Sequence, residues 1–215
     1  VLGGWLCRLA ERVHDAVRRL EAATGDAARA SAVDAARALL ERELRIALPG
    51  ELRSAPTEHQ ASWLAARLDR PIRVCGVVRC VGDPGGAPFW VADGEAGDSA
   101  QIVETAQVDP RAPSQVAIHR SATHFNPVDV VCSLRDHRGR PHELAHHVDP
   151  DAVFLAEKSS GGRALRALEH PGLWNGAMAR WLTLFVEVPA ETFHPVKTIN
   201  DLLAPDHQPP EGGDA

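Results

Sequence analysis

The sequence has very little lysine. Of its 23 basic residues all but Lys158 and Lys197 are arginines. The two side chains are not equivalent, because a guanidinium is a planar fork of donors whereas an ammonium is a compact point charge on a flexible stem. The lysine at position 197 therefore marks either a place that only an ammonium fits or a residue left over by sequence drift. Both interpretations stay open from composition alone.

Long apolar runs are absent as well. No stretch reaches the roughly 18 apolar residues that span a bilayer, and no basic start, apolar run and cleavage site of a signal peptide is present. The formal net charge of −6 argues against a general nucleic-acid binder, which would show a basic stripe. We therefore expect a cytoplasmic protein with neither a membrane nor a nucleic acid as its partner.

Cysteines are few and scattered. Because no pair has C-x-x-C spacing, neither a zinc site nor a disulfide framework is indicated, and free thiols are expected. The chain starts with a valine and its first residues already look helical, so we expect a piece of a longer protein or a processed chain. The four cysteines are Cys7, Cys75, Cys80 and Cys132.

Residues 1–70 have the pattern of helices that pack against a larger core. Apolar residues at steps of three and four from Leu6 to Leu20 share one face of a first helix. A second helix is predicted over residues 30–48, where Gly50 follows as a stop signal.

A third, shorter helix is predicted around Trp63. Thr57 and Gln60 have the spacing of a capping box, which marks the start of a helix. Trp63, Leu64 and Leu68 then form the apolar face of this helix.

From Pro71 onward the sequence is typical of strands separated by turns. β-branched, alternating segments are interrupted by clusters of Gly, Pro and Asp. A helix is predicted at 163–170, and the Pro/Gly-rich tail at 205–215 is predicted to be disordered. The chain is thus an α/β protein with a helical section at 1–70 and an α/β part at 71–204. The predicted strands lie within residues 72–78, 100–108, 128–134, 152–156 and 181–188.

The segment HELAHH at 142–147 matches the H-E-x-x-H pattern of zinc hydrolases. Two histidines four residues apart share an ion only on an α-helix. Pro141 and Pro150 leave little room for a helix, and in a strand His142 and His146 would lie about 13 Å apart. We therefore expect a His-rich hairpin and keep a zinc metallohydrolase only as a remote alternative.

The run VEVPAETFHPVKTINDLL near the end of the chain resembles the C-terminal signature of the UDP-sugar pyrophosphorylases. In those enzymes a strand leads through Pro and Phe into P-V-K-T and then D-L-L. The resemblance implies that Lys197 contacts the phosphates of a nucleotide sugar and is the catalytic residue. The resemblance therefore favours the interpretation that position 197 needs the ammonium group of a lysine.

Three further segments carry the same resemblance. QIVETAQVD and ATHFNPVDVV look like segments that hydrogen-bond sugar hydroxyls, which implies sugar-binding roles for Glu104 and Asn126. GGAPFWVADG looks like the segment whose glycine backbone lies close to the sugar. By spacing, Ala87 holds that place here and Gly86 stands next to it.

The segments RPIRVCGVV, GDPGGAPFWV, HFNPVDVVC and EHPGLWNGAMARW, together with the C-terminal run, resemble the bacterial family called domain of unknown function 4301. The resemblance implies the C-terminal half of a Rossmann-like nucleotide-diphospho-sugar transferase fold, with a mixed sheet preceded by a helical section. The missing N-terminal half would then carry the glycine-rich nucleotide loop and the ligands of a Mg²⁺ ion.

Two more residues are weaker candidates. Lys158 heads KSSGGRAL, where backbone N–H groups at the start of the expected helix would attract a phosphate. The same letters also describe an ordinary exposed turn. Asn175, in PGLWNGAM, is a candidate wall of the sugar pocket, although the neighbouring Trp is equally typical of a core.

The function implied for the full-length protein is sugar-1-phosphate nucleotidyl transfer. Its partners would be a nucleoside triphosphate, a sugar 1-phosphate and the missing N-terminal half. Such chemistry depends on positioning and charge neutralisation, and we expect residues 1–215 alone to be inactive. The alternative is a non-catalytic nucleotide-sugar binding or scaffold module.

Overall fold

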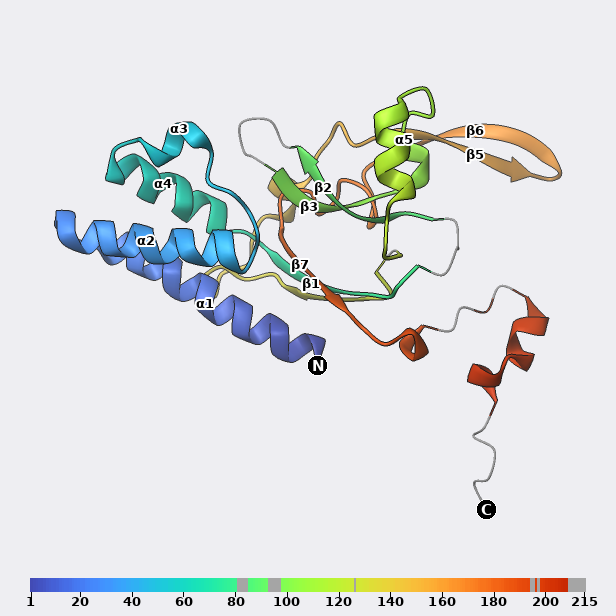
Figure 1. The fold of residues 1–215 in the computed structure, drawn as a ribbon, viewed down its shortest axis with the longest axis horizontal. Coiled ribbons are helices and arrows are strands. Elements are labelled where there is room, and N and C mark those ends of the chain that lie inside the picture. The colour runs from blue at the N-terminus through green and yellow to red at the C-terminus, as the bar shows by residue number, and fades with distance from the viewer. Residues whose placement is uncertain (81–84, 93–97, 126, 194–195, 197, 209–215) are drawn as a thin grey trace, which may run out of the picture.

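A computed structural model describes residues 1–80, 85–92, 98–125, 127–193, 196 and 198–208. Four α-helices stand at one end of the molecule, followed by three small sheets and a fifth helix (Figure 1). This is a mixed α/β fold, as the sequence predicts. Within the described residues, no helix has the length and hydrophobicity needed to cross a membrane. The first four helices are α1 (Leu2–Ala22), α2 (Asp26–Arg42), α3 (Gly50–Arg53) and α4 (Thr57–Leu68).

The apolar face predicted for the first helix is confirmed. Leu9, Val13, Val17 and Leu20 of α1 are all buried, and Leu6 packs against them half-buried. The face meets α2, α4 and the first strand. The spacing of three and four residues thus places one side of α1 in the core.

The second helix differs from its predicted bounds of 30–48. It begins earlier, at Asp26, whose carboxylate favours a helix start, and ends at Arg42. Beyond it Leu44, Ile46 and Leu48 are buried while the residues between them are exposed, which is the period of an extended chain. The apolar residues of 30–48 are buried at most of their positions, but their spacing changes from helical to alternating after Arg42.

Helix α4 is found where the third helix is predicted, but without the capping box. Pro56 occupies the cap position and Thr57 is the first helical residue, while the Gln60 side chain donates to the Ala55 carbonyl oxygen at 2.9 Å. Leu64 and Leu68 are fully buried, as predicted for the apolar face. Proline fits the cap position because the N–H of a cap residue takes no part in the hydrogen bonds of the helix, so none is lost.

The main sheet has three strands in the order β4–β1–β7. β1 (Ile72–Val77) lies in the centre, antiparallel to β4 (Asp129–Ser133) and parallel to β7 (Leu182–Glu187). The sheet is therefore mixed, as predicted. All six residues of β1 are buried because helix α1 packs on it and both of its edges are paired.

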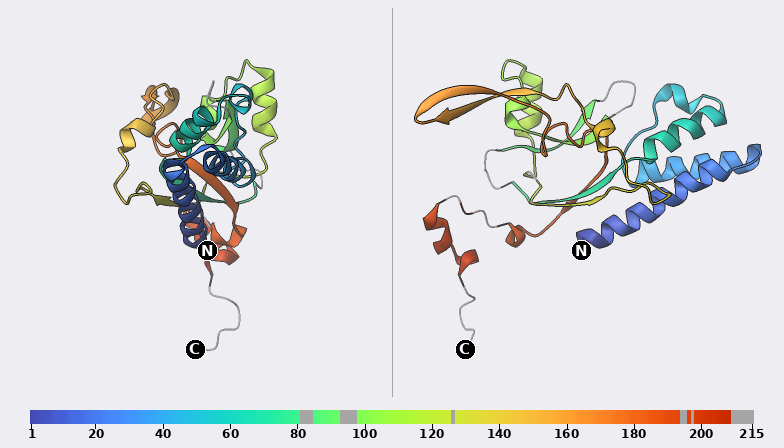
Figure 2. Two further views of the ribbon diagram at one scale, coloured as in Figure 1. Left: turned by 90° about the vertical axis from the view of Figure 1, so that its left-hand side faces the viewer. Right: turned by 180° about the vertical axis from the view of Figure 1, so that it is seen from behind.

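Two hairpins complete the strands. β2 (Ala87–Ala92) pairs with β3 (Asp98–Val103), and β5 (Phe154–Ser160) pairs with β6 (Arg163–Glu169). The β5–β6 hairpin projects from the end of the molecule opposite the helices (Figures 1 and 2). Between the hairpins lies α5 (Pro113–Arg120). Single 3₁₀ turns are η2 (Thr105–Gln107), η3 (Leu144–His147), η4 (Ala190–Thr192), η5 (Ile199–Leu203) and η6 (Pro205–His207).

The helix predicted at 163–170 is wrong, because this segment is strand β6. Gly161 and Gly162 both have positive φ, 56° and 77°. Two consecutive residues of this conformation form the tight turn that joins antiparallel strands. The Gly-Gly pair therefore closes a hairpin and does not open a helix.

Two other boundaries differ. The strand predicted over 100–108 ends at Val103, and Glu104 then caps the η2 turn. The segment 113–120, for which no element is predicted, is helix α5. Pro113 occupies the first turn of α5 and none of its residues is buried, so the sequence shows no apolar stripe there. In the predicted tail, Pro205–His207 form a turn, and 209–215 lie outside the described residues.

One apolar cluster joins the helices to the main sheet. Side chains of α1, α2 and α4 pack together with Leu44, Ile46 and Leu48 of the extended segment, and with Ile72 of β1 and Leu182 of β7. Burial of this cluster is the main source of stability that the sequence provides. No described residue of the hairpins or of α5 belongs to the cluster.

Candidate functional site

A pocket of about 350 Å³ lies where β2, η2 and the end of α5 meet the segment leading into β4. We call it the Gly85 pocket. It brings together residues that are far apart in the sequence, from three of the segments that the sequence analysis selects. Its lining residues are Cys80, Gly85, Gly86, Ala87, Thr105, His119, Arg120, Ala122, His124 and Phe125.

Gly85 is held in close contact with two other segments of the pocket. Its carbonyl oxygen accepts a hydrogen bond from the Thr105 hydroxyl at 2.6 Å. A Cβ atom at this position would lie only 2.3 Å from Cε2 of Phe125. A side chain here would displace the Phe125 ring, so glycine allows the backbone to approach it.

The polar atoms of the pocket come mainly from η2 and α5. Nε2 of His119 lies 3.4 Å from the Thr105 hydroxyl oxygen, and the His119 ring stacks on Phe89 with centroids 5.7 Å apart. Arg120, the last residue of α5, is exposed, and its guanidinium forms no ion pair within the part of the chain that the structure describes. The pocket therefore offers a hydroxyl, an imidazole and a cation to a polar ligand.

At its rim, the pocket is bordered by three polar side chains: Arg79, which follows β1, Glu187 at the end of β7, and His124. His124 Nε2 lies 2.9 Å from Oε2 of Glu187, and Arg79 Nε donates to Oε1 at 3.2 Å. These hydrogen bonds, first that from His124 and then that from Arg79, lower the pKa of Glu187. The Thr123 hydroxyl lies 2.8 Å from the other ring nitrogen of His124 and orients the ring.

The predicted sugar-binding residues have different outcomes. Gly86 and Ala87 line the pocket. Glu104 is half-buried and caps η2: its carboxylate accepts the N–H of Gln107, whose amide oxygen accepts the N–H of Glu104 at 2.9 Å. Its neighbour Thr105, and not Glu104 itself, lines the pocket. A sugar-binding role for Glu104 stays a prediction.

Two predicted residues cannot be located in the site. Asn126 and Lys197 lie outside the described residues. Phe125, next to Asn126, lines the Gly85 pocket, and its ring lies 5.9 Å from that of Phe193 in the C-terminal run. The C-terminal run therefore comes close to the pocket at Phe193.

The anion site predicted at Lys158 lacks its structural basis. Lys158 lies in β5 opposite Leu165, and its ammonium forms an ion pair with Glu169 on β6. No helix begins after Ser159 and Ser160, so there is no row of free N–H groups to attract a phosphate. Lys158 lies on the projecting hairpin and is not a lining residue of the Gly85 pocket.

Asn175 is buried, and its side chain fixes a turn. Its amide nitrogen donates to the carbonyl oxygens of Ala152 at 2.8 Å and His170 at 3.3 Å, and its amide oxygen accepts the N–H of Gly172 at 3.3 Å. These bonds hold the turn that ends at Gly176, whose φ is 74°. Asn175 is not a lining residue of the Gly85 pocket. Its amide group is engaged in structure, so the prediction that it binds a sugar gains no support from geometry.

The HELAHH segment forms no α-helix, as expected, but the His-rich hairpin predicted for it is wrong, because none of its residues belongs to a strand. Leu144–His147 make a single 3₁₀ turn, and His142 precedes it, with its ring edge-on to His147 at 5.6 Å. Burial, then the neighbouring His142, lower the pKa of His147. Among the described residues, no three His, Cys, Asp or Glu side chains are arranged to hold a metal ion.

Sequence reasoning missed several lining residues. Thr105 and Phe125 each stand one position from a residue that the resemblance selects, so their positions were indicated but not their roles. His119 and Arg120 lie on α5, an element that was not predicted. An unburied helix has no periodic apolar signal from which its polar residues could be placed on a face.

Comparison with known protein families assigns the chain. Residues 1–208 match the family described as domain of unknown function (DUF4301). The chain belongs to this family. No curated protein matches this DUF4301 chain significantly.

Among solved structures, two mutants of UDP-glucose pyrophosphorylase from Leishmania major, both in complex with UDP-glucose, are similar to the DUF4301 chain. The first has 18% identity and a TM-score of 0.39, covering 80% of this chain and 39% of its own. The second has 19% identity and a TM-score of 0.39, covering 71% of this chain and 34% of its own. The DUF4301 chain thus spans well under half the length of these enzymes.

Proposed function

We propose that this DUF4301 chain is the sugar-binding part of a nucleotidyltransferase-like protein, and that the sugar lies in the Gly85 pocket. The observation that supports the proposal is that three separate sequence segments line the same pocket. Residues 85–87, the Glu104–Thr105 pair and the segment ending at Phe125 were singled out by separate sequence motifs, and each contributes lining residues to one pocket. Unrelated surface segments would have no reason to meet in this way.

The chemistry of the pocket suits a sugar phosphate. Sugar hydroxyls need both donors and acceptors, which the Thr105 hydroxyl, the His119 ring and the backbone around Gly85 supply. The Phe125 ring offers an apolar face for the C–H groups of the sugar. Arg120, exposed at the pocket, is suited to pair with a phosphate.

In the full-length protein, the proposed reaction joins a sugar 1-phosphate to a nucleoside triphosphate. An oxygen of the sugar phosphate attacks the α-phosphorus, the bond to the β-phosphate breaks, and a nucleotide sugar and pyrophosphate are formed. Lys197 is proposed to contact the phosphates, where an ammonium neutralises the developing charge. The chain is proposed to be the C-terminal half of such an enzyme.

The Mg²⁺ expected for such a reaction does not fit the described residues, because none of them form a cluster of carboxylates or other ligands. We propose that its ligands lie in the missing N-terminal half.

The test is binding of UDP-glucose and other nucleotide sugars to full-length protein by calorimetry. Thr105→Val removes the hydroxyl that joins Gly85 to η2, and His119→Gln removes the imidazole, so each should weaken binding about tenfold. Thr192→Val, an exposed hydroxyl on η4, is the matched control and should bind normally. Unchanged binding in both pocket variants would refute the proposed site. Binding without release of pyrophosphate from a nucleoside triphosphate would favour the binding-module alternative.

A further inference from the structure

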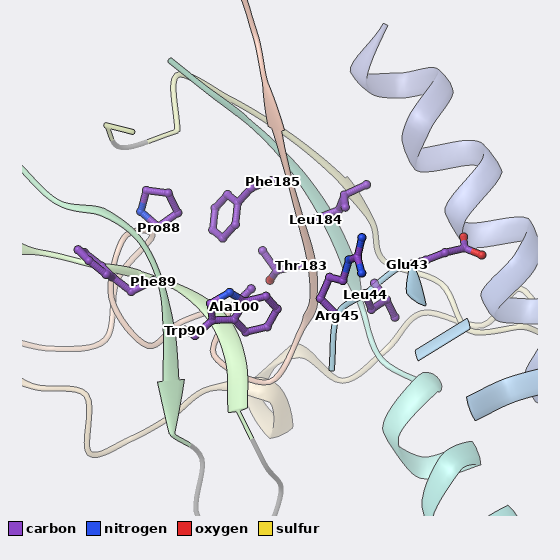
Figure 3. A pocket seen from close by; sticks show the side chains of 10 residues that line it. All are labelled: Glu43, Leu44, Arg45, Pro88, Phe89, Trp90, Ala100, Thr183, Leu184 and Phe185. Carbon is purple, nitrogen blue, oxygen red and sulfur yellow. The ribbon is translucent and has the colours of Figure 1, made fainter. Parts of the chain in front are cut away.

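A second pocket lies between the extended segment after α2 and strands β2, β3 and β7 (Figure 3). We call it the Arg45 pocket; its volume is about 240 Å³. It shares no lining residue with the Gly85 pocket. Its lining residues are Glu43, Leu44, Arg45, Pro88, Phe89, Trp90, Ala100, Thr183, Leu184 and Phe185.

Arg45 has an unusual backbone. Its φ of 57° makes it the one non-glycine residue with positive φ among the described residues. This conformation is costly for a residue with a Cβ, and it persists only when the surroundings impose it. The buried side chains of Leu44 and Ile46 on either side anchor the segment, so the strained backbone sets the direction of the Arg45 side chain.

The Arg45 guanidinium is available for a ligand. The neighbouring carboxylate, Glu43, points toward α1 and pairs with Arg12 instead (Figure 3). Arg45 itself is exposed and forms no ion pair with any acidic residue that the structure describes. The pocket therefore has a cation at its mouth without a carboxylate to neutralise it.

A second cation lies beneath the floor of the pocket. Arg73 of β1 is 3% exposed, and its Nε donates to the Thr183 hydroxyl oxygen at 2.8 Å. Its other hydrogen bond goes to the amide oxygen of Gln101 at 3.2 Å, so both of these acceptors are neutral. Burial lowers the pKa of Arg73. Because the Thr183 oxygen accepts from Arg73, its own proton remains to be donated into the pocket.

The walls of the pocket are aromatic. Phe89, Trp90 and Phe185 line it together with Pro88, and Figure 3 shows the Phe185 ring directed toward Pro88 above Thr183. Trp90 is 52% exposed although it is the largest apolar side chain of its hairpin. Aromatic faces recognise flat rings by stacking.

We propose that the Arg45 pocket binds a small planar anion, an aromatic ring that carries a carboxylate or a phosphate. The ring lies against Trp90 and Phe185, and the anionic group accepts hydrogen bonds from Arg45 and the Thr183 hydroxyl. The two pockets share no lining residue, although the Phe89 ring of this pocket stacks on His119 of the Gly85 pocket. Arg45 and Thr183 are not used by the proposed sugar site, so a variant at Arg45 tests this proposal separately.

In the experiment, the chain of residues 1–215 is titrated with benzoate and with phenyl phosphate. Binding is measured by calorimetry and by tryptophan fluorescence. Cyclohexanecarboxylate and inorganic phosphate serve as probes that lack the flat ring. Both aromatic anions should bind at least about tenfold more tightly than their non-aromatic counterparts. The tighter of the two identifies the preferred anionic group.

The decisive variant is Arg45→Gly. Glycine tolerates positive φ, so this variant should be at least as stable as the original chain while binding falls about tenfold or more. Arg42→Gln removes a cation from the exposed end of α2, outside the pocket, and should leave binding unchanged. Undiminished binding by Arg45→Gly, or no binding of either aromatic anion at 10 mM (roughly the weakest meaningful affinity), would refute the proposal.

Discussion

The helical end of the molecule and the end that bears the hairpins are built differently. In the helical end, Leu40, Leu64 and Leu68 are fully buried, and ion pairs such as Asp15–Arg19 and Asp34–Arg37 lie on the surface. Arg67 of α4, which is 3% exposed, is the exception among the charged side chains of these helices. In the β5–β6 hairpin, Leu155, Leu165 and Leu168 are all exposed. The stability of the chain therefore resides in the helices and the main sheet.

The Gly85 pocket is built largely by turns, by a short strand and by α5, which has no buried residue. Such lightly packed elements are free to carry function because they contribute little to the core.

The largest effect we expect contrasts two leucines. Leu64→Ala opens a cavity in the core cluster and should lower the free energy of unfolding by about 2–5 kcal/mol. Leu168→Ala, at a side chain that is 55% exposed, should change it by no more than about 0.5 kcal/mol. Urea titrations of the two variants measure both values. Equal effects would mean that the hairpin is covered in the folded protein and that the comparison is wrong.

The next prediction concerns Lys197 and activity. In full-length protein Lys197→Ala should lower turnover by roughly 10² or more, the scale of losing one preorganised charge. Lys197→Arg should be nearly as poor, because the planar guanidinium does not replace a compact ammonium. Neither variant should lose stability in a thermal melt. Full activity of Lys197→Arg would show that the lysine is a leftover of sequence drift.

A smaller effect is expected at the turn that follows β4. Asp136 is only 7% exposed; burial raises the pKa of its carboxyl, but the backbone N–H and guanidinium of Arg140 outweigh this and hold it at about 2. Because the pKa of Asp136 is lower in the folded state than in the unfolded state, its ionised carboxylate stabilises the protein. This stabilisation is complete above pH 3.8 and is lost as the pH falls toward 2. Asp136→Asn should therefore cost about 1–3 kcal/mol at neutral pH and flatten the decline in stability between pH 4 and 2.

The matched control for this turn is Asp129→Asn, at an exposed residue of β4. It should leave the dependence of stability on pH unchanged. Denaturant unfolding at a series of pH values provides the measurement. An unaltered slope in Asp136→Asn would show that the bonds to Arg140 do not persist in solution.

The smallest effect is expected at the other lysine. The ion pair of Lys158 with Glu169 is on the surface, with the lysine side chain 54% exposed, so Lys158→Ala should cost less than about 1 kcal/mol. Binding of nucleotide sugars to full-length protein should be unaffected, in contrast to the loss of turnover at Lys197. A tenfold loss of affinity in Lys158→Ala would contradict this prediction and show that the projecting hairpin takes part in binding the nucleotide sugar.

Elements with strong periodicity were predictable from the sequence, and elements without it were not. The face of α1 and strands β1, β4 and β7 follow from apolar spacing, because a buried face must repeat with the period of its element. Helix α5 buries nothing, so its sequence has no such repeat. Gly161 and Gly162 stand in front of a segment whose sequence is compatible with a helix, but a pair of glycines with positive φ makes a hairpin turn.

The site was predictable only in part. The motifs selected Gly86 and Ala87, which line the Gly85 pocket, and the neighbours of Thr105 and Phe125. They could not select His119, because its place in the pocket depends on a helix that the sequence does not indicate. In the sequence Asn175 looks available for a ligand, but its side-chain amide bonds to Gly172 within its own turn and to the carbonyl oxygen of Ala152, which is distant in the sequence. Only the fold reveals these partners. An Asn whose amide stabilises a turn cannot be distinguished in the sequence from an Asn whose amide binds a ligand, because both have the same donors and acceptor.

The parallel pairing of β1 with β7 also bears on how the chain reaches its folded state. Arg73 and Thr183, which face each other across this pair, are 110 residues apart in the sequence. Leu182 belongs to the same apolar cluster as the first helices. On the ribosome, the helical segment is therefore complete long before the strand that closes its core has been synthesised. Pairing over such a distance requires closure of a long loop and slows folding. In the meantime the exposed faces of α1 and β1 are the surfaces on which a chaperone would act.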